Sequence, residues 1–185
     1  MALTDDAVLQ SVDFSRFRQV VDVAGGEGRL LTRILAENPQ TTGVLFDLPS
    51  GIAAARAAVL ASAAGVADRM QMVVGDVFEG LPAGADAYLF QRFLHGWDDR
   101  DAQRILERCR EVIAPDGRVI LVDAVVVPNA PRSLGVFFDL DMMVVAEGRA
   151  RTEAEHRALL AAAGFELVAV VETGTPFSVI EAVVA

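Results

Sequence analysis

A short apolar run that ends in a glycine turn constrains the fold of this chain most strongly. Residues 19–24 are apolar and β-branched, as in a buried strand, and Gly25 and Gly26 follow them directly. Residues 28–37 then carry apolar side chains at helical spacing. A strand that turns tightly into a helix is the first unit of a parallel α/β sheet. Glycines at that turn allow a ligand to approach the backbone, beside the unpaired N–H groups at the start of the helix.

The same alternation of short strands and longer helices continues to the end of the chain. Further strands are predicted at residues 42–46, 70–74, 87–90 and 118–127, further helices at 51–64, 99–114 and 152–164, and a hairpin at 165–171 and 177–184. The last helix opens with a capping box formed by Thr152 and Glu155. This order predicts an α/β fold with a mainly parallel sheet, helices on both faces and a C-terminal antiparallel hairpin.

The composition fits a globular protein that binds small molecules. Hydrophobic residues make up 53% of the chain, and 26 acidic against 16 basic residues give a net charge of −10. Such a charge repels phosphate backbones, so we expect no nucleic-acid partner. The sequence shows no basic leader and no apolar run of about 18 residues, so we expect no signal peptide, no membrane span and a cytoplasmic location. Cys109 is the only cysteine, and we expect a half-buried structural thiol.

Acidic residues flank the glycine turn and indicate what it could bind. Asp22 precedes the turn and Glu27 lies within it. A pyrophosphate would avoid these carboxylates, and the dinucleotide-binding fingerprint would need a third glycine where this chain has Leu31. A cationic or zwitterionic ligand fits better, although an ordinary strand–helix turn would contain the same glycines.

Two more acidic residues follow the next two predicted strands. Asp47 lies about 20 residues after the last glycine of the turn, where a carboxylate can accept both hydroxyls of a ribose. Asp76 could accept from an adenine amino group, while Val77 or Phe78 lies against the ring. Asp47 could instead cap a helix before Pro49, and Asp76 could be a turn residue. Together with the glycine turn, they predict a nucleoside site at the carboxyl ends of the strands.

The segments VVDVAGGEG, FDLP, GDVF, FLHGWDD, APDGRVILVDAVVVP and GRARTEAEHRALLAAAGF occur in this order along the chain. Together they resemble the plant-type O-methyltransferase family, and in particular its bacterial natural-product members. The resemblance runs from about Phe14 to the C-terminus. It implies the Rossmann-like seven-stranded methyltransferase sheet, S-adenosyl-L-methionine as methyl donor, S-adenosyl-L-homocysteine as product and a hydroxylated aromatic acceptor. Residues 19–185 would then be the S-adenosylmethionine-binding catalytic domain, and residues 1–18 an N-terminal remnant or lead-in.

The resemblance also implies roles for individual residues. The cofactor would contact Asp22, Gly25, Gly26, Gly28, Asp47, Leu48, Asp76, Val77 and Gln91, the last at a position where the family often has lysine. The acceptor pocket would include Trp97, Phe138, Met142 and Met143, although the last three could equally pack in a core. No metal ion is expected.

His95 matches the general base of the resembled family, and Asp123 matches an acidic partner of that base. A phenol is a poor nucleophile until it loses its proton. A histidine with a pKa near 6.5 can take that proton at neutral pH if it lies within hydrogen-bond reach. The other histidine, His156, is expected to be a solvated residue of the last helix.

Departures from the family pattern leave other interpretations open. Gly96 replaces the usual acid beside the histidine, and Ala150 stands where the family has a glutamate that orients the base, a role that Glu147 could take. The family also has a long N-terminal helical domain for dimerisation, so a homodimer is possible. One alternative is a domain that binds S-adenosylmethionine with little or altered activity. Another is an NAD-dependent oxidoreductase, which rests on the glycine turn and Asp47 alone.

Overall fold

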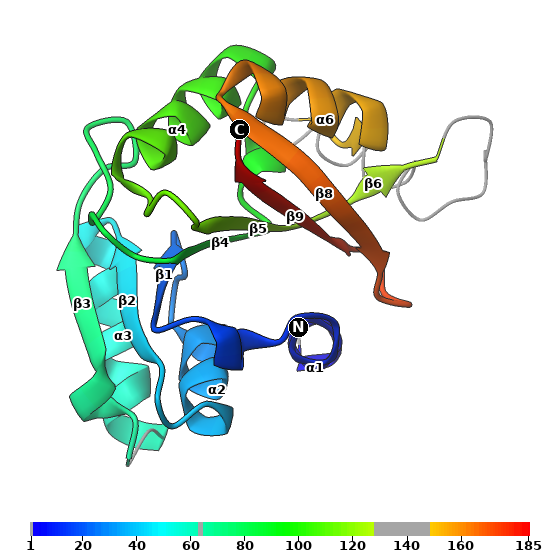
Figure 1. The fold of residues 1–185 in the computed structure, drawn as a ribbon. Helices are drawn as coiled ribbons and strands as arrows, with labels where there is room; N and C mark the ends of the chain where they lie inside the picture. Colours follow the sequence, from blue (N-terminus) through cyan, green and yellow to red (C-terminus); the bar gives the residue numbers. More distant parts are fainter. Residues whose placement is uncertain (1, 63–64, 128–148) are drawn as a thin grey trace.

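The computed structural model describes residues 2–62, 65–127 and 149–185 (Figure 1). The strands are β1 (Gln19–Val23), β2 (Thr42–Asp47), β3 (Met70–Val74), β4 (Ala87–Gln91), β5 (Arg118–Asp123), β6 (Val125–Val126), β7 (Arg151–Thr152), β8 (Phe165–Glu172) and β9 (Ser178–Val184). The α-helices are α1 (Ala2–Ser11), α2 (Arg29–Glu37), α3 (Pro49–Ser62), α4 (Asp99–Val112) and α6 (Glu153–Ala162). Short 3₁₀ helices are η1 (Phe14–Arg16), η2 (Ala67–Arg69) and η3 (Leu94–Gly96). None of these described helices has the length and apolar character that crossing a membrane requires.

Seven strands form one sheet in the order β3-β2-β1-β4-β5-β9-β8, and β6 pairs separately with β7. The strands β1 to β5 run parallel, whereas β9 is antiparallel to both β5 and β8. The predicted mainly parallel sheet with a C-terminal antiparallel hairpin is therefore confirmed. The strand order reverses between β1 and β4, and ligands of open α/β sheets bind at the carboxyl ends of strands at such a point.

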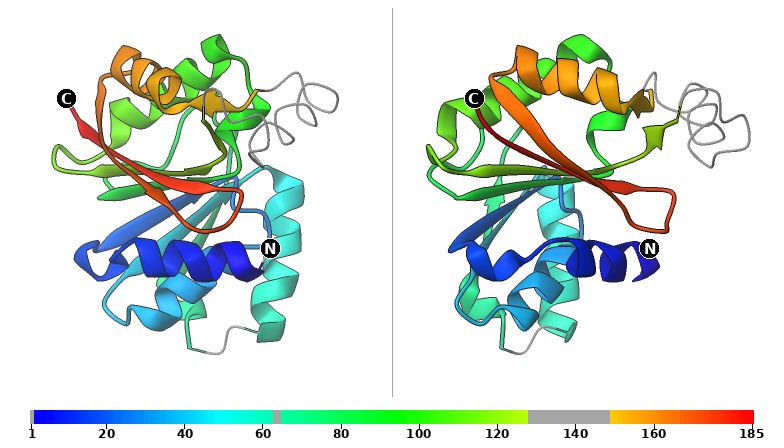
Figure 2. Two further views of the ribbon diagram at one scale, coloured as in Figure 1. Left: turned by 90° about the vertical axis from the view of Figure 1, so that its right-hand side faces the viewer. Right: turned by 45° about the vertical axis from the view of Figure 1, so that its right-hand side comes forward.

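Helices cover both faces of the sheet, as predicted. In Figures 1 and 2, α4 and α6 lie on one face, and α1, α2 and α3 lie on the other. Side chains alternate between the two faces along each strand. In β4, Tyr88 and Phe90 pack in the core beneath α4 and α6, whereas Ala87 and Leu89 pack in the core on the opposite face. This alternation determines to which face of the sheet the polar side chains at the strand ends point.

The position that lacks a third glycine is filled by a core residue. Leu31 in α2 is fully buried. A Cβ atom on Gly43 of β2 would lie 2.9 Å from the Leu31 Cδ1 atom, which is too close for a real contact. The close approach of helix and sheet is therefore provided by a glycine on the strand instead of one on the helix.

The segment expected as a lead-in packs on the sheet. The segment that contains α1 and the 3₁₀ turn η1 buries Val8, Val12, Phe14 and Phe17 in the same core as α2. These residues therefore contribute apolar contacts to the domain that follows them.

Three predictions about buried and extended segments are wrong. The strand predicted at residues 118–127 ends at Asp123, because the Asp123 carboxylate accepts the Ala124 N–H at 2.8 Å and the next two residues pair with β7. His156 is only 1% exposed, because it continues the buried stripe of α6 formed by Leu159 and Leu160. Cys109 is fully buried on the apolar stripe of α4, not half-buried.

Candidate functional site

The glycine turn after β1 has a backbone that only small residues tolerate. Gly26 and Gly28 have positive φ angles of 59° and 69°, and Ala24 shares this conformation at 55°. A Cβ atom on Gly25 would lie 2.4 Å from the Asp22 Oδ2 atom. The turn is tied to β2, because the Gly26 N–H donates to the Asp47 Oδ2 atom at 2.8 Å. The backbone is thus open on one side and fixed in place.

Asp22 lies buried beneath this turn. Its side chain is 2% exposed, and its Oδ1 atom has no hydrogen-bond partner. Burial first, and then the neighbouring carboxylates of Asp47 and Asp5, raise the pKa of Asp22 to about 7. A buried acid beside two other acids favours the approach of a cation.

Asp5 of α1 reaches the same end of the sheet, which the sequence did not indicate. Its side chain is 1% exposed, and its Oδ2 atom forms an ion pair of 2.7 Å with the Arg29 Nε atom. The Gln91 side chain, expected beside the adenosine, donates to the Asp5 Oδ1 atom at 3.0 Å. The two residues lie 86 positions apart in the sequence, so no local pattern could have revealed the contact.

A pocket of about 200 Å³ lies beside the ends of β2 and β3. It is lined by Ala24, Phe46, Asp47, Leu48, Gly75, Asp76, Val77, Phe78, Phe93 and Trp97. The Asp47 Oδ1 atom accepts the Leu48 N–H at 2.7 Å, and the Asp76 Oδ1 atom accepts the Phe78 N–H at 2.9 Å. The pocket therefore combines two fixed carboxylates with apolar and aromatic walls, which suits a nucleoside.

Trp97 lines this pocket together with the residues predicted for the cofactor. Its ring meets Phe78 edge-on at 5.0 Å between centroids and Phe93 at 5.9 Å. The sequence had placed Trp97 with the acceptor. The other three residues predicted for the acceptor pocket, Phe138, Met142 and Met143, lie outside the described residues, as does Glu147.

His95 and Asp123 are brought together from the ends of β4 and β5. The His95 Nδ1 atom lies 2.7 Å from the Asp123 Oδ1 atom, and both side chains are buried. A carboxylate at this distance fixes the ring orientation and places the proton of neutral imidazole on Nδ1. His95 and Asp123, which the family resemblance pairs, are therefore in direct contact.

Arg151 supports the turn that carries His95, and the sequence did not single it out. Its guanidinium is 1% exposed and donates to the Leu94 carbonyl at 3.1 Å and to the Trp97 carbonyl at 2.8 Å. It also forms an ion pair with Asp99 at 2.9 Å. The arginine therefore holds the backbone of η3 from both sides of the histidine.

The residues that depart from the family pattern lie around the same pair. A Cβ atom on Gly96 would meet nothing within 4 Å, so a side chain would fit there. Ala150 is buried. His156 lies near Asp123 and the Ala124 backbone, but neither of its ring nitrogens reaches a partner with full hydrogen-bond geometry. Burial lowers the pKa of His156 from its usual value, opposed in part by the Asp123 carboxylate.

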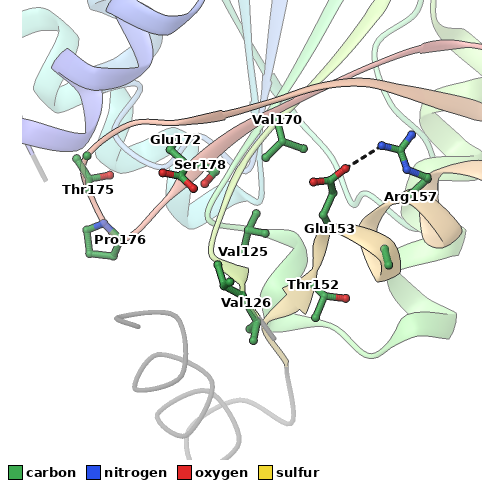
Figure 3. A pocket seen from close by; sticks show the side chains of 13 residues that line it. Val125, Val126, Thr152, Glu153, Arg157, Val170, Glu172, Thr175, Pro176 and Ser178 are labelled. Carbon is green, nitrogen blue, oxygen red and sulfur yellow. Dashed lines mark hydrogen bonds and ion pairs between the residues drawn. The ribbon is translucent and has the colours of Figure 1, made fainter. Parts of the chain in front are cut away.

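A larger pocket of about 720 Å³ lies between β6, the start of α6 and the β8–β9 hairpin (Figure 3). Valines 125–127 and Val170 form its apolar side, and an ion pair of 2.9 Å between Glu153 and Arg157 lies within it. Among the residues that the structure describes, it shares no lining residue with the pocket beside β2 and β3. Among residues 2–62, 65–127 and 149–185, no cluster of three or more His, Cys, Asp or Glu side chains could hold a metal ion.

Comparisons with known proteins agree with this arrangement. A family model of the O-methyltransferase domain matches residues 1–166. The 3-amino-4-hydroxybenzoate 4-O-methyltransferase of Streptomyces cremeus is 45% identical over 156 residues, which are 84% of this chain and 42% of that protein. The 8-amino-8-demethylriboflavin N,N-dimethyltransferase of Streptomyces davaonensis is 40% identical over 178 residues, 95% of this chain and 50% of that protein.

A solved structure extends the comparison to three dimensions. The O-methyltransferase NcsB1 from neocarzinostatin biosynthesis, in complex with S-adenosylmethionine and 2-hydroxy-5-methyl naphthoic acid, superposes with a TM-score of 0.86 at 34% identity. The match covers 96% of this chain and 52% of that one, so the chain spans about half the length of the proteins that it matches. On the family model and these identities, the chain belongs to the O-methyltransferase domain family.

Proposed function

We propose that this domain binds S-adenosyl-L-methionine and transfers its methyl group to a hydroxyl group of an aromatic small molecule. One observation carries the proposal: the His95 imidazole, 2.7 Å from the Asp123 carboxylate, lies at the same edge of the sheet as the acids at the carboxyl ends of β1, β2 and β3. A base and a set of acids for a cationic nucleoside ligand thus share one edge. The methyltransferase family and the ligands of its solved member support this assignment.

The residues present fit the cofactor. The unpartnered oxygen of Asp22 beneath the glycine turn suits the positively charged amino-acid end, which Gly25, Gly26 and Gly28 would approach through their backbone. Asp47 would accept the two ribose hydroxyls, with Leu48 beside the sugar. Asp76 and Val77 would flank the adenine in the 200 Å³ pocket. When bound, the cofactor would supply a methyl group on a positively charged sulfur, and that sulfur is the leaving atom when the acceptor oxygen takes the methyl group.

His95 would act as the general base. Because its Nδ1–H faces Asp123, its Nε2 atom carries the lone pair that accepts the proton of the acceptor hydroxyl. The Asp123 carboxylate would stabilise the resulting imidazolium, and Arg151 would keep the turn in position. The methyl group would pass from the sulfur to the acceptor oxygen with S-adenosyl-L-homocysteine as the leaving group, and His95 would return its proton to water.

A hydroxyl acceptor is favoured over an amine by this base. An aromatic amine has a lone pair before it loses a proton, whereas a phenol needs deprotonation to become a good nucleophile. The relative from Streptomyces cremeus is a 4-O-methyltransferase of 3-amino-4-hydroxybenzoate, and the relative from Streptomyces davaonensis is an N,N-dimethyltransferase of 8-amino-8-demethylriboflavin. Trp97, which lines the pocket assigned to the adenine, is proposed to contact the aromatic acceptor as well, together with Phe138, Met142 and Met143.

Isothermal titration of the 185-residue chain with S-adenosyl-L-homocysteine tests the cofactor site. We expect binding by the wild type, a loss of about tenfold or more in Asp47→Asn, and no change in Asp116→Asn, an exposed aspartate in the turn before β5. Preferential binding of NAD, or no binding of either ligand by the wild type, would contradict the proposal.

Transfer of labelled methyl groups to a panel of phenols tests the reaction itself. We expect turnover that falls by about 100-fold or more in His95→Gln while the affinity for S-adenosyl-L-homocysteine stays unchanged. The open space at Gly96 and the apolar side chain at Ala150 favour a second candidate, a domain that binds the cofactor with little or altered activity. Tight binding without transfer to any phenol would support that candidate.

The partners and the location follow as further proposals. A homodimer is proposed because the resembled family dimerises through a helical region, and light scattering measures it. The net charge of −10 disfavours nucleic acid, which a gel-shift assay checks. A cytoplasmic location is proposed because the methyl donor is a cytoplasmic metabolite, and microscopy of a tagged chain tests it.

A further inference from the structure

The pocket of about 720 Å³ beside β6 and the β8–β9 hairpin has the size of a small-molecule site (Figure 3). Its walls come from β6, the start of α6 and the hairpin, which are far apart in the sequence. One of its lining residues, Ser178, is directly opposite Asp123 in the ladder between β5 and β9. Strands β8 and β9 lie at the other end of the strand order from β2 and β3, so this pocket is separate from the one proposed for the nucleoside.

Four valines form an apolar wall of this pocket. They are Val125, Val126, Val127 and Val170. Val125 and Val170 pack against the core beneath α4 and α6, whereas Val127 is 49% exposed. Because a hydrocarbon group that covers such a wall removes apolar surface from water, the wall favours a ligand with an apolar body.

The polar part of the pocket wall carries more negative than positive charge. Glu153 and Arg157 neutralise each other in an ion pair of 2.9 Å, and the Arg157 guanidinium also donates to the Leu167 carbonyl at 3.1 Å. Within the described part of the chain, the Glu172 carboxylate has neither a salt bridge nor a side-chain hydrogen bond. One carboxylate thus remains for a ligand, and it complements a positive charge.

We propose that this pocket is a second ligand site, which binds an apolar amine in its protonated form. The hydrocarbon part of the ligand lies against the four valines, and its ammonium group faces the Glu172 carboxylate. The hydroxyl of Ser178, at 9% exposure, is a further acceptor for the ammonium group. The net charge of −10 also favours the approach of a cation over that of an anion.

Three probes with the same aromatic body test the requirement for charge. At neutral pH, 2-(1-naphthyl)ethylamine carries an ammonium group, 2-(1-naphthyl)ethanol is uncharged and 1-naphthaleneacetic acid carries a carboxylate. Titration of the whole chain, followed by NMR of the valine methyl groups, measures the affinity and shows where each probe binds. We expect the amine to shift the signals of the four pocket valines, the alcohol to bind about threefold more weakly and the acid about tenfold more weakly.

Variants with matched controls separate the role of the acid from that of the cavity. Glu172→Gln should make the amine and the alcohol bind alike, whereas Glu166→Gln, at another exposed glutamate of β8, should change neither affinity. Ala154→Trp places a large side chain in the pocket and should abolish binding of all three probes. Ala158→Trp places the same side chain at an exposed residue one turn further along α6, which does not line the pocket, and should leave binding unchanged.

Each outcome of the experiment bears on the inference. Pocket valines that respond to none of the probes, or an acid that binds as tightly as the amine, would overturn it, and so would equal effects of Glu172→Gln and Glu166→Gln. Valine signals that shift with protein concentration in the absence of a probe would show that a second copy of the chain fills the pocket instead. If Ala154→Trp does not fold, Glu172→Gln decides the matter, because it removes only an exposed charge. These measurements use no S-adenosyl-L-methionine, so their failure would leave the proposed function intact.

Discussion

At the scale of single residues, Asp22 links stability to pH. Its pKa is raised to about 7 by burial first, and then by Asp47 and Asp5, while the unfolded chain has the ordinary value near 3.8. The folded state therefore binds more protons than the unfolded state between these values, and the free energy of unfolding falls as the pH rises through this window. One such group lowers it by about 4 kcal/mol over the whole range.

Asp22→Asn should remove this loss. Urea unfolding at pH 5 and pH 8 is expected to show a wild type that loses stability at pH 8 and a variant that does so much less. Asp116→Asn is the control, since that aspartate is exposed. An equal loss in wild type and Asp22→Asn would show that Asp22 is already ionised at pH 5.

His156 links stability to pH in the opposite direction. Burial lowers its pKa in the folded state below the ordinary 6.5, so the unfolded state binds more protons and stability falls as the pH drops below about 6.5. His156→Phe replaces an imidazole with two unpartnered nitrogens by an apolar ring. We expect about 1–3 kcal/mol of added stability at pH 7.5, and less acid sensitivity.

Thermal unfolding at pH 5 and pH 7.5 measures both effects. His156→Gln is a useful comparison, because it keeps polar atoms in the site but cannot take up a proton. If His156→Phe is less stable than wild type at both pH values, the imidazole has a polar partner whose loss outweighs the gain.

At the scale of elements, Arg151 joins β7 to the turn that carries His95. Arg151→Met would leave the carbonyls of Leu94 and Trp97 without their donor in a buried place. We expect a loss of about 3 kcal/mol in the free energy of unfolding by urea. Arg108→Met on α4 is the control, because the ion pair of Arg108 with Glu111 is exposed and should be worth less than about 1 kcal/mol.

The elements also show what a sequence can predict. The capping box of Thr152 and Glu155 and the glycine turn depend on neighbours within a few residues, and the structure contains them. The break at Ala124 was missed because an aspartate side chain captured the next N–H, which apolar periodicity cannot show. His156 was misjudged because its residue type outweighed its place on the buried stripe.

The residues of the candidate site also fall into those that the sequence indicated and those that it did not. Glycines and acids directly after strands were found because the ends of parallel strands share one edge of the sheet. Asp5 and Arg151 were missed because their partners lie far away in the sequence, at Gln91 for the first and at Leu94 and Trp97 for the second. A single sequence contains no signal for such contacts.

At the scale of the whole molecule, ligand binding and pH should be coupled through Asp22. A cationic ligand favours the ionised carboxylate, which the free domain holds protonated below about pH 7. Binding at pH 6 must therefore release a proton, whereas binding at pH 8 needs to release little. The affinity for S-adenosyl-L-homocysteine should rise by about tenfold from pH 6 to pH 8, because the Asp22 carboxyl of the free domain is already ionised at pH 8.

The shift in melting temperature at a fixed concentration of S-adenosyl-L-homocysteine measures this coupling. We expect a larger shift at pH 8 than at pH 6 for wild type, and an equal shift at both pH values for Asp22→Asn. The groups that face Asp22 are Asp5 of α1, Asp47 of β2 and, through Asp5, Arg29 of α2. With 5′-methylthioadenosine, which carries no ammonium group, the shift should not depend on pH through Asp22. A pH-dependent shift with that ligand would mean that the acid cluster responds to the nucleoside and not to the amino-acid end.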